Sequence, residues 1–406
     1  MHVLMVADFY WPFLGGVEQH VRTVAHELTR RGHRVTVVTT LVGDAAAHER
    51  DGDVEVVRIR TTVQKLPWLF DQQRPWAPPV PDPVATWAIR RIVAERRPDV
   101  IHGHDWLARS AMIPGRQEVP FVSTQHYYTL TCAKKNLLRD GQPCPGPEFH
   151  ACWSCARTHY GDAKGAFTLA GTWVGAKLER RRVSHQISVS AATARGNALD
   201  PQTPTSVVIP NCLPPRTVGD GTDDDLLDAL PEAPLMYVGD FRSVKGVDVL
   251  LAAYVESGVD RPLVLIGKRW PESPASLPPG VIAFENWPNS VVRAAMAKAR
   301  AVVVPSVWAE PFGIVAIEAM DAGTPVVASA TGGLVEIIDD GVSGLLVAPS
   351  SVTDLAAALR LVHVDDALCA SLARGGAMAV ERYAAERVVD EIVGIYEAAI
   401  AEHTSS

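Results

Sequence analysis

Two glutamates in the last third of the chain are spaced so that together they could hold one elongated ligand. Glu310 and Glu318 enclose the segment Pro-Phe-Gly-Ile-Val-Ala-Ile, between an apolar run and a helix predicted to end at Gly323. Pro311 is expected in the first turn of that helix, where the N–H group that proline lacks is not needed. Eight helical positions would separate the carboxylates by about 12 Å, so they cannot share a proton as a catalytic dyad.

Free backbone N–H groups at the start of the same helix predict an anion site. Phe312, Gly313 and Ile314 would point their amides out of the helix start, where the helix dipole favours negative charge. Gly313 would also let a ligand approach the backbone closely. The alternative is that Glu310 only caps the helix and Glu318 is merely exposed.

Four cysteines make up a second candidate site, this time for a metal ion. Cys132, Cys144, Cys152 and Cys155 fall within 24 residues and end in a C-x-x-C pair, in a segment with few periodic apolar positions. Four thiolates suit a closed tetrahedral zinc site, which would supply folding energy that this segment lacks. The spacing is looser than in a standard zinc ribbon, and free thiols or a redox pair are the alternatives.

The elements that position these residues alternate between strand and helix. An apolar run at Val3–Ala7, helical spacing from Val17 to Leu28 and a β-branched run at Arg34–Thr39 predict a β-α-β unit, which implies a parallel sheet. The alternation continues to residue 209, interrupted by a proline-rich stretch and by the insert 127–163. A linker at 213–233 is rich in Pro, Gly and acidic residues, and strands then recur at 235–238, 263–266, 281–284, 301–304, 325–328 and 344–347.

This pattern predicts an α/β fold with two Rossmann-like, doubly wound domains that face each other across a cleft. Residues 1–212 would form the N-terminal domain with the Cys-rich insert 127–163, and residues 234–385 the C-terminal domain. Residues 386–406 are expected to form an amphipathic helix and a tail. The length of 406 residues agrees with two domains of average size.

The segment from Val302 to Ile338 resembles the donor-binding core of retaining GT-B glycosyltransferases of family four, which carry an E-x(7)-E motif. The resemblance implies that Glu310 contacts hydroxyls of the transferred sugar and that Glu318 binds the nucleotide ribose. It also implies that a second loop lies against the diphosphate sugar, namely Thr331, Gly332 and Gly333.

Further matches extend this resemblance along the chain. Gly15 and Gly16 resemble the glycine loop whose backbone faces the donor phosphates and the acceptor, and bare amides at a helix start agree with that role. Lys245 matches the lysine that neutralises the diphosphate. Asp240 stands where the family has an arginine, so Arg242 is expected to supply the second cation.

A histidine of the same family lies near the transferred sugar and the acceptor, and His126 matches it at the end of a predicted strand. His104 and Asp105 are weaker candidates. Asp51 and Asp53 fit the Asp-x-Asp pattern of metal-dependent transferases but are predicted to lie in a turn. We therefore expect donor activation without a catalytic metal, with the diphosphate charge offset by Lys245, Arg242 and helix N-termini.

The resemblance implies a retaining glycosyltransferase that moves a sugar from a nucleotide-diphosphate-sugar co-substrate to a hydroxyl acceptor, which could be a glycan, a lipid-linked molecule or a small metabolite. The donor would lie in the C-terminal domain and the acceptor in the N-terminal domain, with Glu310, His126 and Lys245 as the residues central to catalysis. The alternatives are a nucleotide-sugar epimerase and a sugar-binding protein that has lost activity.

Charge and hydropathy bear on partners and location. Residues 1–200 hold 25 Lys and Arg against 19 Asp and Glu, whereas the rest of the chain holds 13 against 27. No concentrated basic stripe predicts nucleic-acid binding, and no apolar run or leader predicts a membrane span or secretion, so a cytoplasmic protein is expected. One group of basic and aromatic residues in the first half could contact the inner face of an anionic membrane, although we prefer the interpretation that they are ordinary solvated helix faces. These residues are Arg90, Arg91, Arg96, Arg97 and Arg180–Arg182, with Trp68, Trp76 and Trp87.

Overall fold

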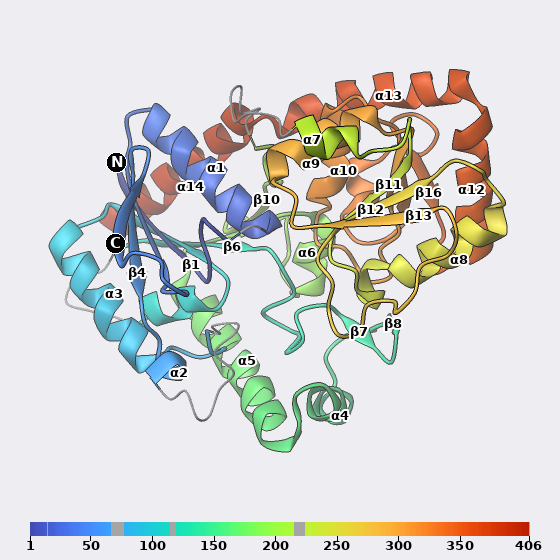
Figure 1. Ribbon diagram of the computed structural model, residues 1–406. Coiled ribbons are helices and arrows are strands. Elements are labelled where there is room, and N and C mark those ends of the chain that lie inside the picture. Colours follow the sequence, from blue (N-terminus) through green and yellow to red (C-terminus); the bar gives the residue numbers. More distant parts are fainter. Residues whose placement is uncertain (14, 66–76, 114–118, 215–223, 406) are drawn as a thin grey trace. The chain divides into compact units, whose positions relative to one another are not determined.

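The chain forms two compact α/β units, each built on its own parallel sheet (Figure 1). The computed structural model describes residues 1–13, 15–65, 77–113, 119–214 and 224–405. The first unit consists of Met1–Asp140, Cys144–Pro214 and Ala385–Ser406, and the second of Gly141–Pro143 and Pro215–Ala384. The predicted fold class is thereby confirmed for each unit.

The first unit contains an eight-stranded sheet with the order β10-β9-β6-β5-β1-β2-β4-β3. All neighbouring strands are parallel except β3 and β4, whose hairpin turns at Gly52, as expected for the Asp-x-Asp segment. The predicted β-α-β unit is present, with α1 (Gly16–Arg30) between the first two strands. The strands are β1 (His2–Ala7), β2 (Arg34–Thr40), β3 (His48–Asp51), β4 (Val54–Ile59), β5 (Val100–His104), β6 (Phe121–Gln125), β9 (His185–Ser188) and β10 (Ser206–Val208).

Helices cover both faces of this sheet, which explains why β1 is a continuous apolar run. Successive strand residues point to opposite faces, so Val3 and Met5 pack against α1 while Leu4 and Val6 pack against α3 (Pro83–Arg96) and the 3-10 turn η1 (Leu107–Ala111). Before residue 215 the unit also contains the helices α2 (Thr62–Lys65), α4 (Phe149–Tyr160), α5 (Asp162–Arg182) and α6 (Ala191–Gly196).

The C-terminal helix α14 (Ala385–Ser405) belongs to the first unit, although the chain reaches it from the second. Its apolar side joins the core beneath α1 through Val388, Val389, Ile392 and Tyr396. The sequence predicts the amphipathic character of this helix, but its partner is known only from the structure.

The second unit contains a six-stranded sheet that is parallel throughout, in the order β13-β12-β11-β14-β15-β16. Its strands are β11 (Leu235–Val238), β12 (Leu263–Gly267), β13 (Val281–Glu285), β14 (Ala301–Val304), β15 (Val326–Ser329) and β16 (Leu345–Val347). Its helical elements are α7 (Asp224–Asp228), η2 (Ser243–Lys245), α8 (Val247–Ser257), α9 (Asn289–Lys298), α10 (Ile314–Asp321), α11 (Leu334–Ile337), α12 (Val352–Val364), α13 (Asp366–Val380) and η3 (Glu381–Tyr383).

The insert contains more regular structure than its sequence predicts. It includes the helix α4 and a two-stranded sheet of β7 (Leu138–Arg139) and β8 (Gln142–Pro143). Among the basic residues considered for membrane contact, Arg91 pairs with Glu95 and Arg96 with Glu55, while Trp87 is exposed. Trp68 and Trp76 lie outside the described residues. In the described part of the chain, no helix is long and apolar enough to cross a bilayer.

Candidate functional site

Three side chains donate hydrogen bonds to the buried carboxylate of Glu310. Nζ of Lys245 lies 3.0 Å from Oε1 and 3.1 Å from Oε2. Oγ of Ser306 and Nε1 of Trp308 each donate to Oε2 at 2.8 Å. The carboxylate is therefore fixed in position, one cation balances its charge, and Oε1 accepts fewer hydrogen bonds than Oε2. Glu310 and Lys245 were predicted from sequence, whereas Ser306 and Trp308 were not.

A close backbone approach brings Lys245 to this place. Lys245 ends η2, and Gly246 follows with a φ of +78°, a conformation that favours glycine. A Cβ atom on Gly246 would lie 1.8 Å from the carbonyl oxygen of Pro305, so the two loops touch backbone to backbone. The N–H of Val307 also donates to the carbonyl of Val244 at 3.1 Å. The loops that follow β11 and β14 are thus joined beside the Lys245–Glu310 pair.

The Thr331–Gly333 loop packs onto the other side of the Glu310 backbone. The N–H of Gly333 donates to the carbonyl of Glu310 at 2.6 Å. Gly332 has a φ of +57°, and a Cβ there would lie 2.1 Å from the Glu310 carbonyl oxygen. The structure therefore brings together three loops whose roles were predicted separately from the sequence.

The predicted helix start at Pro311 is wrong. The helix α10 begins at Ile314, after Gly313, which has a φ of +113°. Because the Glu310 carbonyl is bonded to Gly333, the segment before Gly313 follows the neighbouring loop and does not enter the helix. Of the three residues predicted to expose helix-start amides, only Ile314 is helical, while Phe312 is a buried side chain of the preceding loop.

Glu318 lies inside α10 and is buried, contrary to the exposed alternative. Burial raises the pKa of its carboxyl to about 7, against the opposing effects of Arg293 and of a hydrogen bond from Asn289 on α9. Its Oε1 atom is buried without a hydrogen-bond partner among the described residues. An unpaired buried acceptor of this kind is suited to a ligand that donates hydroxyl protons.

Arg242 points toward a partner other than Glu310. Its Nε donates to Oε1 of Glu272 at 2.8 Å, and its guanidinium lies 5.1 Å from the centre of the Trp270 ring. Among the described contacts, the side chain of Arg242 therefore touches neither Lys245 nor Glu310. Its role as the second cation that neutralises the diphosphate stays a prediction.

The glycine loop of the first unit begins α1 as predicted. Gly15 is the N-cap residue and Gly16 the first residue of the helix. A Cβ on Gly15 would lie 2.3 Å from Oε2 of Glu18, so this acidic side chain folds back over the helix start. The N-terminal amides of α1 thus already have a carboxylate beside them.

His126 belongs to a group of buried histidines at the carboxyl ends of β5 and β6. Its Nε2 lies 3.0 Å from Nδ1 of His104, and its ring centre lies 5.3 Å from that of His20. His102 bonds to the hydroxyl of Tyr396 on α14 at 2.6 Å. Burial lowers the pKa of His102 and of His126 to about 3, and that of His104 well below its usual value. These imidazoles are therefore neutral near pH 7.

A pair of acidic residues at the same edge of the sheet was largely missed from sequence. Asp8 follows β1, and Asp105 follows β5 with a φ of +61°, which is strained for a non-glycine residue. Burial raises the pKa of Asp8 to about 6 and that of Asp105 in the same direction, while Lys135 opposes both shifts. Nζ of Lys135 lies 3.8 Å from Oδ2 of Asp8 and 4.1 Å from the ring centre of Trp106. The position of both acidic residues directly after buried strands could have predicted this pair from the sequence. Lys135 could not be predicted in the same way, because it comes from the insert.

The four clustered cysteines are free thiols and line one pocket. As their side chains stand, no group of three or more His, Cys, Asp or Glu residues in the described ranges could hold a metal ion. The predicted zinc site is thus not preformed in this arrangement.

Two parallel α/β units, one of which gathers Glu310, Lys245 and a glycine loop at its strand ends, define a two-domain Rossmann-type protein. Two family models divide the chain between these units. Residues 14–215 match the model described as Glycosyltransferase Family 4, and residues 229–377 match Glycosyl transferases group 1. The chain belongs to the glycosyltransferases of this family, with the GT-B fold.

Individual relatives agree with this assignment. The chain is 28% identical to D-inositol 3-phosphate glycosyltransferase of Acidothermus cellulolyticus, over 97% of this chain and 87% of that protein. It is also 28% identical to glycogen synthase of Mycobacterium tuberculosis, over 92% and 89%. Similar solved structures include sucrose-phosphate synthase from Thermosynechococcus elongatus (TM-score 0.72, 19% identity, 99% and 100% coverage) and Anabaena HepE in complex with UDP-glucose (TM-score 0.68, 19%, 98% and 100%).

Proposed function

We propose that the protein is a retaining hexosyltransferase that moves a sugar from a nucleoside diphosphate sugar to a hydroxyl group of an acceptor. The observation that carries this proposal is the anchored Lys245–Glu310 pair, followed eight residues later by the buried Glu318. The donor class is supported by relatives whose structures contain UDP-glucose, in HepE, or ADP and acarbose, in starch synthase IV.

In this proposal the second unit recognises the donor at three points. Oε1 of Glu310 has remaining acceptor capacity for a sugar hydroxyl, because Lys245 is the only described residue that donates to it. The unpaired Oε1 of Glu318 would accept from a ribose hydroxyl. The amides at the start of α10 would approach the donor beside the loop of Gly332 and Gly333, whose lack of side chains allows its close contact with the backbone of residues 310–312.

Charge stabilisation of the departing nucleoside diphosphate would come from the protein itself. Lys245 donates two hydrogen bonds to Glu310 and has a third N–H for a phosphate oxygen. Arg242 would join it after leaving Glu272. Preorganised donors of this kind stabilise developing negative charge most when water is excluded, and they make a catalytic metal unnecessary in the proposal.

The acceptor would bind to the first unit, near the buried histidines and the Asp8–Asp105 pair. His126 is neutral at pH 7 because of its burial, so it would orient a hydroxyl by hydrogen bonding and would not act as a cation. Gly15 and Gly16 would contribute amides from α1. Peripheral contact of this unit with an anionic membrane remains part of the prediction, as does a cytoplasmic location.

A transfer assay with a panel of nucleotide sugars and acceptors tests the proposal. We expect nucleoside diphosphate to be released in proportion to acceptor, and the product to keep the anomeric configuration of the donor in its NMR spectrum. Conversion of a nucleotide sugar without acceptor would support the epimerase alternative, and inversion at the anomeric carbon would contradict retention. Absence of any turnover together with tight donor binding would support the sugar-binding alternative.

A further inference from the structure

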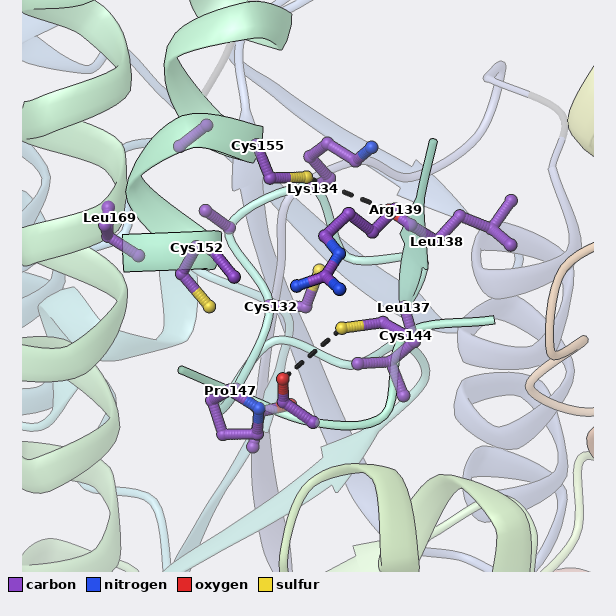
Figure 2. Close-up of a pocket in the computed structure, with 15 residues that line it drawn as sticks. Cys132, Lys134, Leu137, Leu138, Arg139, Cys144, Pro147, Cys152, Cys155 and Leu169 are labelled. Carbon is purple, nitrogen blue, oxygen red and sulfur yellow. Dashed lines mark hydrogen bonds between the residues drawn. The ribbon is translucent and has the colours of Figure 1, made fainter. Parts of the chain in front are cut away.

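The insert between β6 and α5 gathers four thiols around one pocket (Figure 2). Cys132, Cys144, Cys152 and Cys155 all line it, and the empty space there amounts to about 450 Å³, part of which is open to solvent. The two other cysteines of the chain, Cys212 and Cys369, are buried elsewhere. The fold of the insert thus places the thiol groups of four cysteines, up to 23 positions apart in sequence, around one pocket.

One side of this pocket is a well-anchored helix. Cys152 and Cys155 are three residues apart on α4, so their side chains project from the same face. Glu148 caps the start of α4 by accepting from two backbone N–H groups, and the hydroxyl of Tyr160 at its end donates to the carbonyl of Ala133 at 3.0 Å. A Cβ on Gly165 of α5 would lie 2.8 Å from the carbonyl oxygen of Ala156, so α4 and α5 pack closely.

The other side is a loop folded back on itself. The N–H of Cys144 donates to the carbonyl of Leu137 at 2.7 Å, which brings Cys144 back beside the segment that follows Cys132. Figure 2 shows the sulfur of Cys144 directed toward the Cys132 side chain, while Cys152 and Cys155 enter the pocket from α4. Each half of the quartet is therefore held by contacts that do not involve the sulfur atoms.

The apolar cluster that packs around α4 is small. It consists of Ala133, Ala156 and Leu169, with Cys152 and two tryptophans partly buried against it, whereas the other buried apolar side chains of the insert, Tyr128, Leu130 and Leu138, lie outside this cluster. By contrast, more than a dozen buried side chains form each cluster around the main sheets. A segment with so small a core needs another source of folding energy, and metal–thiolate bonds provide it in small domains.

We propose that Cys132, Cys144, Cys152 and Cys155 bind one Zn²⁺ ion as a closed, tetrahedral, structural site. Two of the thiols now donate only weak sulfur hydrogen bonds, from Cys144 to the carbonyl of Gly146 at 3.4 Å and from Cys155 to that of Leu138 at 3.9 Å. Changes of side-chain rotamer exchange these bonds for metal ligation, with release of the four thiol protons. Four thiolates and Zn²⁺ leave a net charge of −2, which Lys134 and Arg139 at the pocket lining offset.

The site also has a structural consequence at the sheet edge of the first unit. Lys135 lies in the loop between Cys132 and Cys144, and its N–H donates to the carbonyl of Cys132 at 3.0 Å. The same residue contacts Asp8 and the ring of Trp106. By ordering this loop, the metal holds the ammonium group of Lys135 beside the buried acidic pair. The effect of the metal on Lys135 follows from the geometry of the loop and does not depend on the proposed transfer activity.

Metal analysis of the full-length chain, purified under reducing conditions from zinc-supplemented cultures, tests the site. We expect about one zinc per chain in the unaltered protein and about a tenth of that or less in the double variant Cys152→Ser/Cys155→Ser. The matched controls Cys212→Ser and Cys369→Ser remove buried thiols outside the insert and should retain zinc. Zinc retained in the double variant, or lost equally in the controls, would overturn the proposal.

Cobalt substitution of the unaltered protein gives a readout that does not depend on a folded variant. We expect Co²⁺ to produce intense thiolate-to-metal absorption and the visible bands of a tetrahedral site, and Zn²⁺ to abolish them by displacement. Failure of zinc-free, reduced protein to bind Co²⁺ would overturn the proposal. The proposal would also be overturned if the mass of the protein, purified under these conditions, were lower by the hydrogens lost in forming two disulfides.

Discussion

Lys245 and Glu310 form an ion pair between loops 65 residues apart in sequence, with Nζ 3.0 Å and 3.1 Å from the two carboxylate oxygens. Neither residue is held by its partner alone. Ser306 and Trp308 orient the carboxylate, and the backbone contact between Gly246 and Pro305 sets the position of the lysine. A charge pair positioned from both sides is rigid before a ligand arrives, which is the condition for electrostatic catalysis.

Removal of either charge should reduce turnover far more than stability. For Lys245→Met and Glu310→Gln we expect kcat/KM to fall by about 100-fold or more, the range seen when one preorganised donor is lost. Lys298→Met is the matched control, because Lys298 lies in the last turn of α9 and no described contact joins it to this pair. Steady-state kinetics and thermal unfolding measure the two effects. Unaltered kcat/KM in both site variants would refute the site assignment.

The contact between the glycine loop and Glu310 predicts a different response in two glycines. Gly332→Ala places a Cβ 2.1 Å from the Glu310 carbonyl oxygen, so the loop must shift and donor affinity should fall about tenfold or more. Gly341→Ala is the control, because it also has a positive φ, +74°, but no atom within 4 Å of the added Cβ. Titration calorimetry with a nucleotide sugar compares them. Equal affinity in the two variants would show that the close approach is unimportant for binding.

Glu318 should make the second unit less stable as pH rises. Because its pKa is about 7 in the folded chain and near 4.5 when unfolded, its contribution is fully present below pH 4.5 and is lost as pH rises to 7. The free energy of unfolding of Glu318→Gln, relative to the unaltered protein, should therefore increase by on the order of 2 kcal/mol between pH 5 and pH 8. Denaturant unfolding at the two pH values measures this, and a difference independent of pH would contradict the proposed burial.

The buried histidines predict the opposite pH dependence in the first unit. Folding lowers the pKa of His102 and His126 from 6.5 to about 3, so their neutral forms stabilise the fold above pH 6.5 and that contribution is lost as pH falls. Unfolding followed by a probe in this unit should shift to lower denaturant concentration below pH 6.5. His102→Gln should weaken this acid dependence, and an unchanged dependence in that variant would assign the effect to other groups.

The hydroxyl of Tyr396 should tie the C-terminal helix to the first unit. Tyr396→Phe removes its hydrogen bond to Nδ1 of His102 and leaves a buried imidazole nitrogen unpaired, at a cost of about 1–3 kcal/mol. The loss should appear in the unfolding of the first unit and not of the second. Equal destabilisation of both units would contradict this attachment of α14.

Apolar runs in the sequence predict the central strands of both sheets well, because strands such as β1 and β14 are buried on both faces and are therefore continuously apolar. The predicted strand at 235–238 coincides with β11, and the predicted strand at 301–304 coincides with β14. The helix α4 was missed because its apolar cluster is small and its positions show little helical periodicity. The α10 start was misplaced because it depends on a hydrogen bond between Glu310 and Gly333, a contact between separate loops.

The candidate site was predictable in its residue types but not in its pairings. The spacing of Glu310 and Glu318 is visible in the sequence, whereas the contact of Lys245 with Glu310 depends on the packing of two strand-end loops. The same reason explains why Ser306 and Lys135 were missed. The pairing of Arg242 with Glu272 could not be read from a motif, because both residues lie in irregular segments.

Titration of the purified chain with a panel of nucleotide sugars tests the central claim most directly. We expect at least one nucleoside diphosphate sugar to bind with one-to-one stoichiometry, and the Lys245→Met variant to bind the same compound about tenfold or more weakly while remaining folded. If no nucleotide sugar binds at millimolar concentration, or if the variant binds as tightly as the unaltered protein, the Lys245–Glu310 pair is not the donor site.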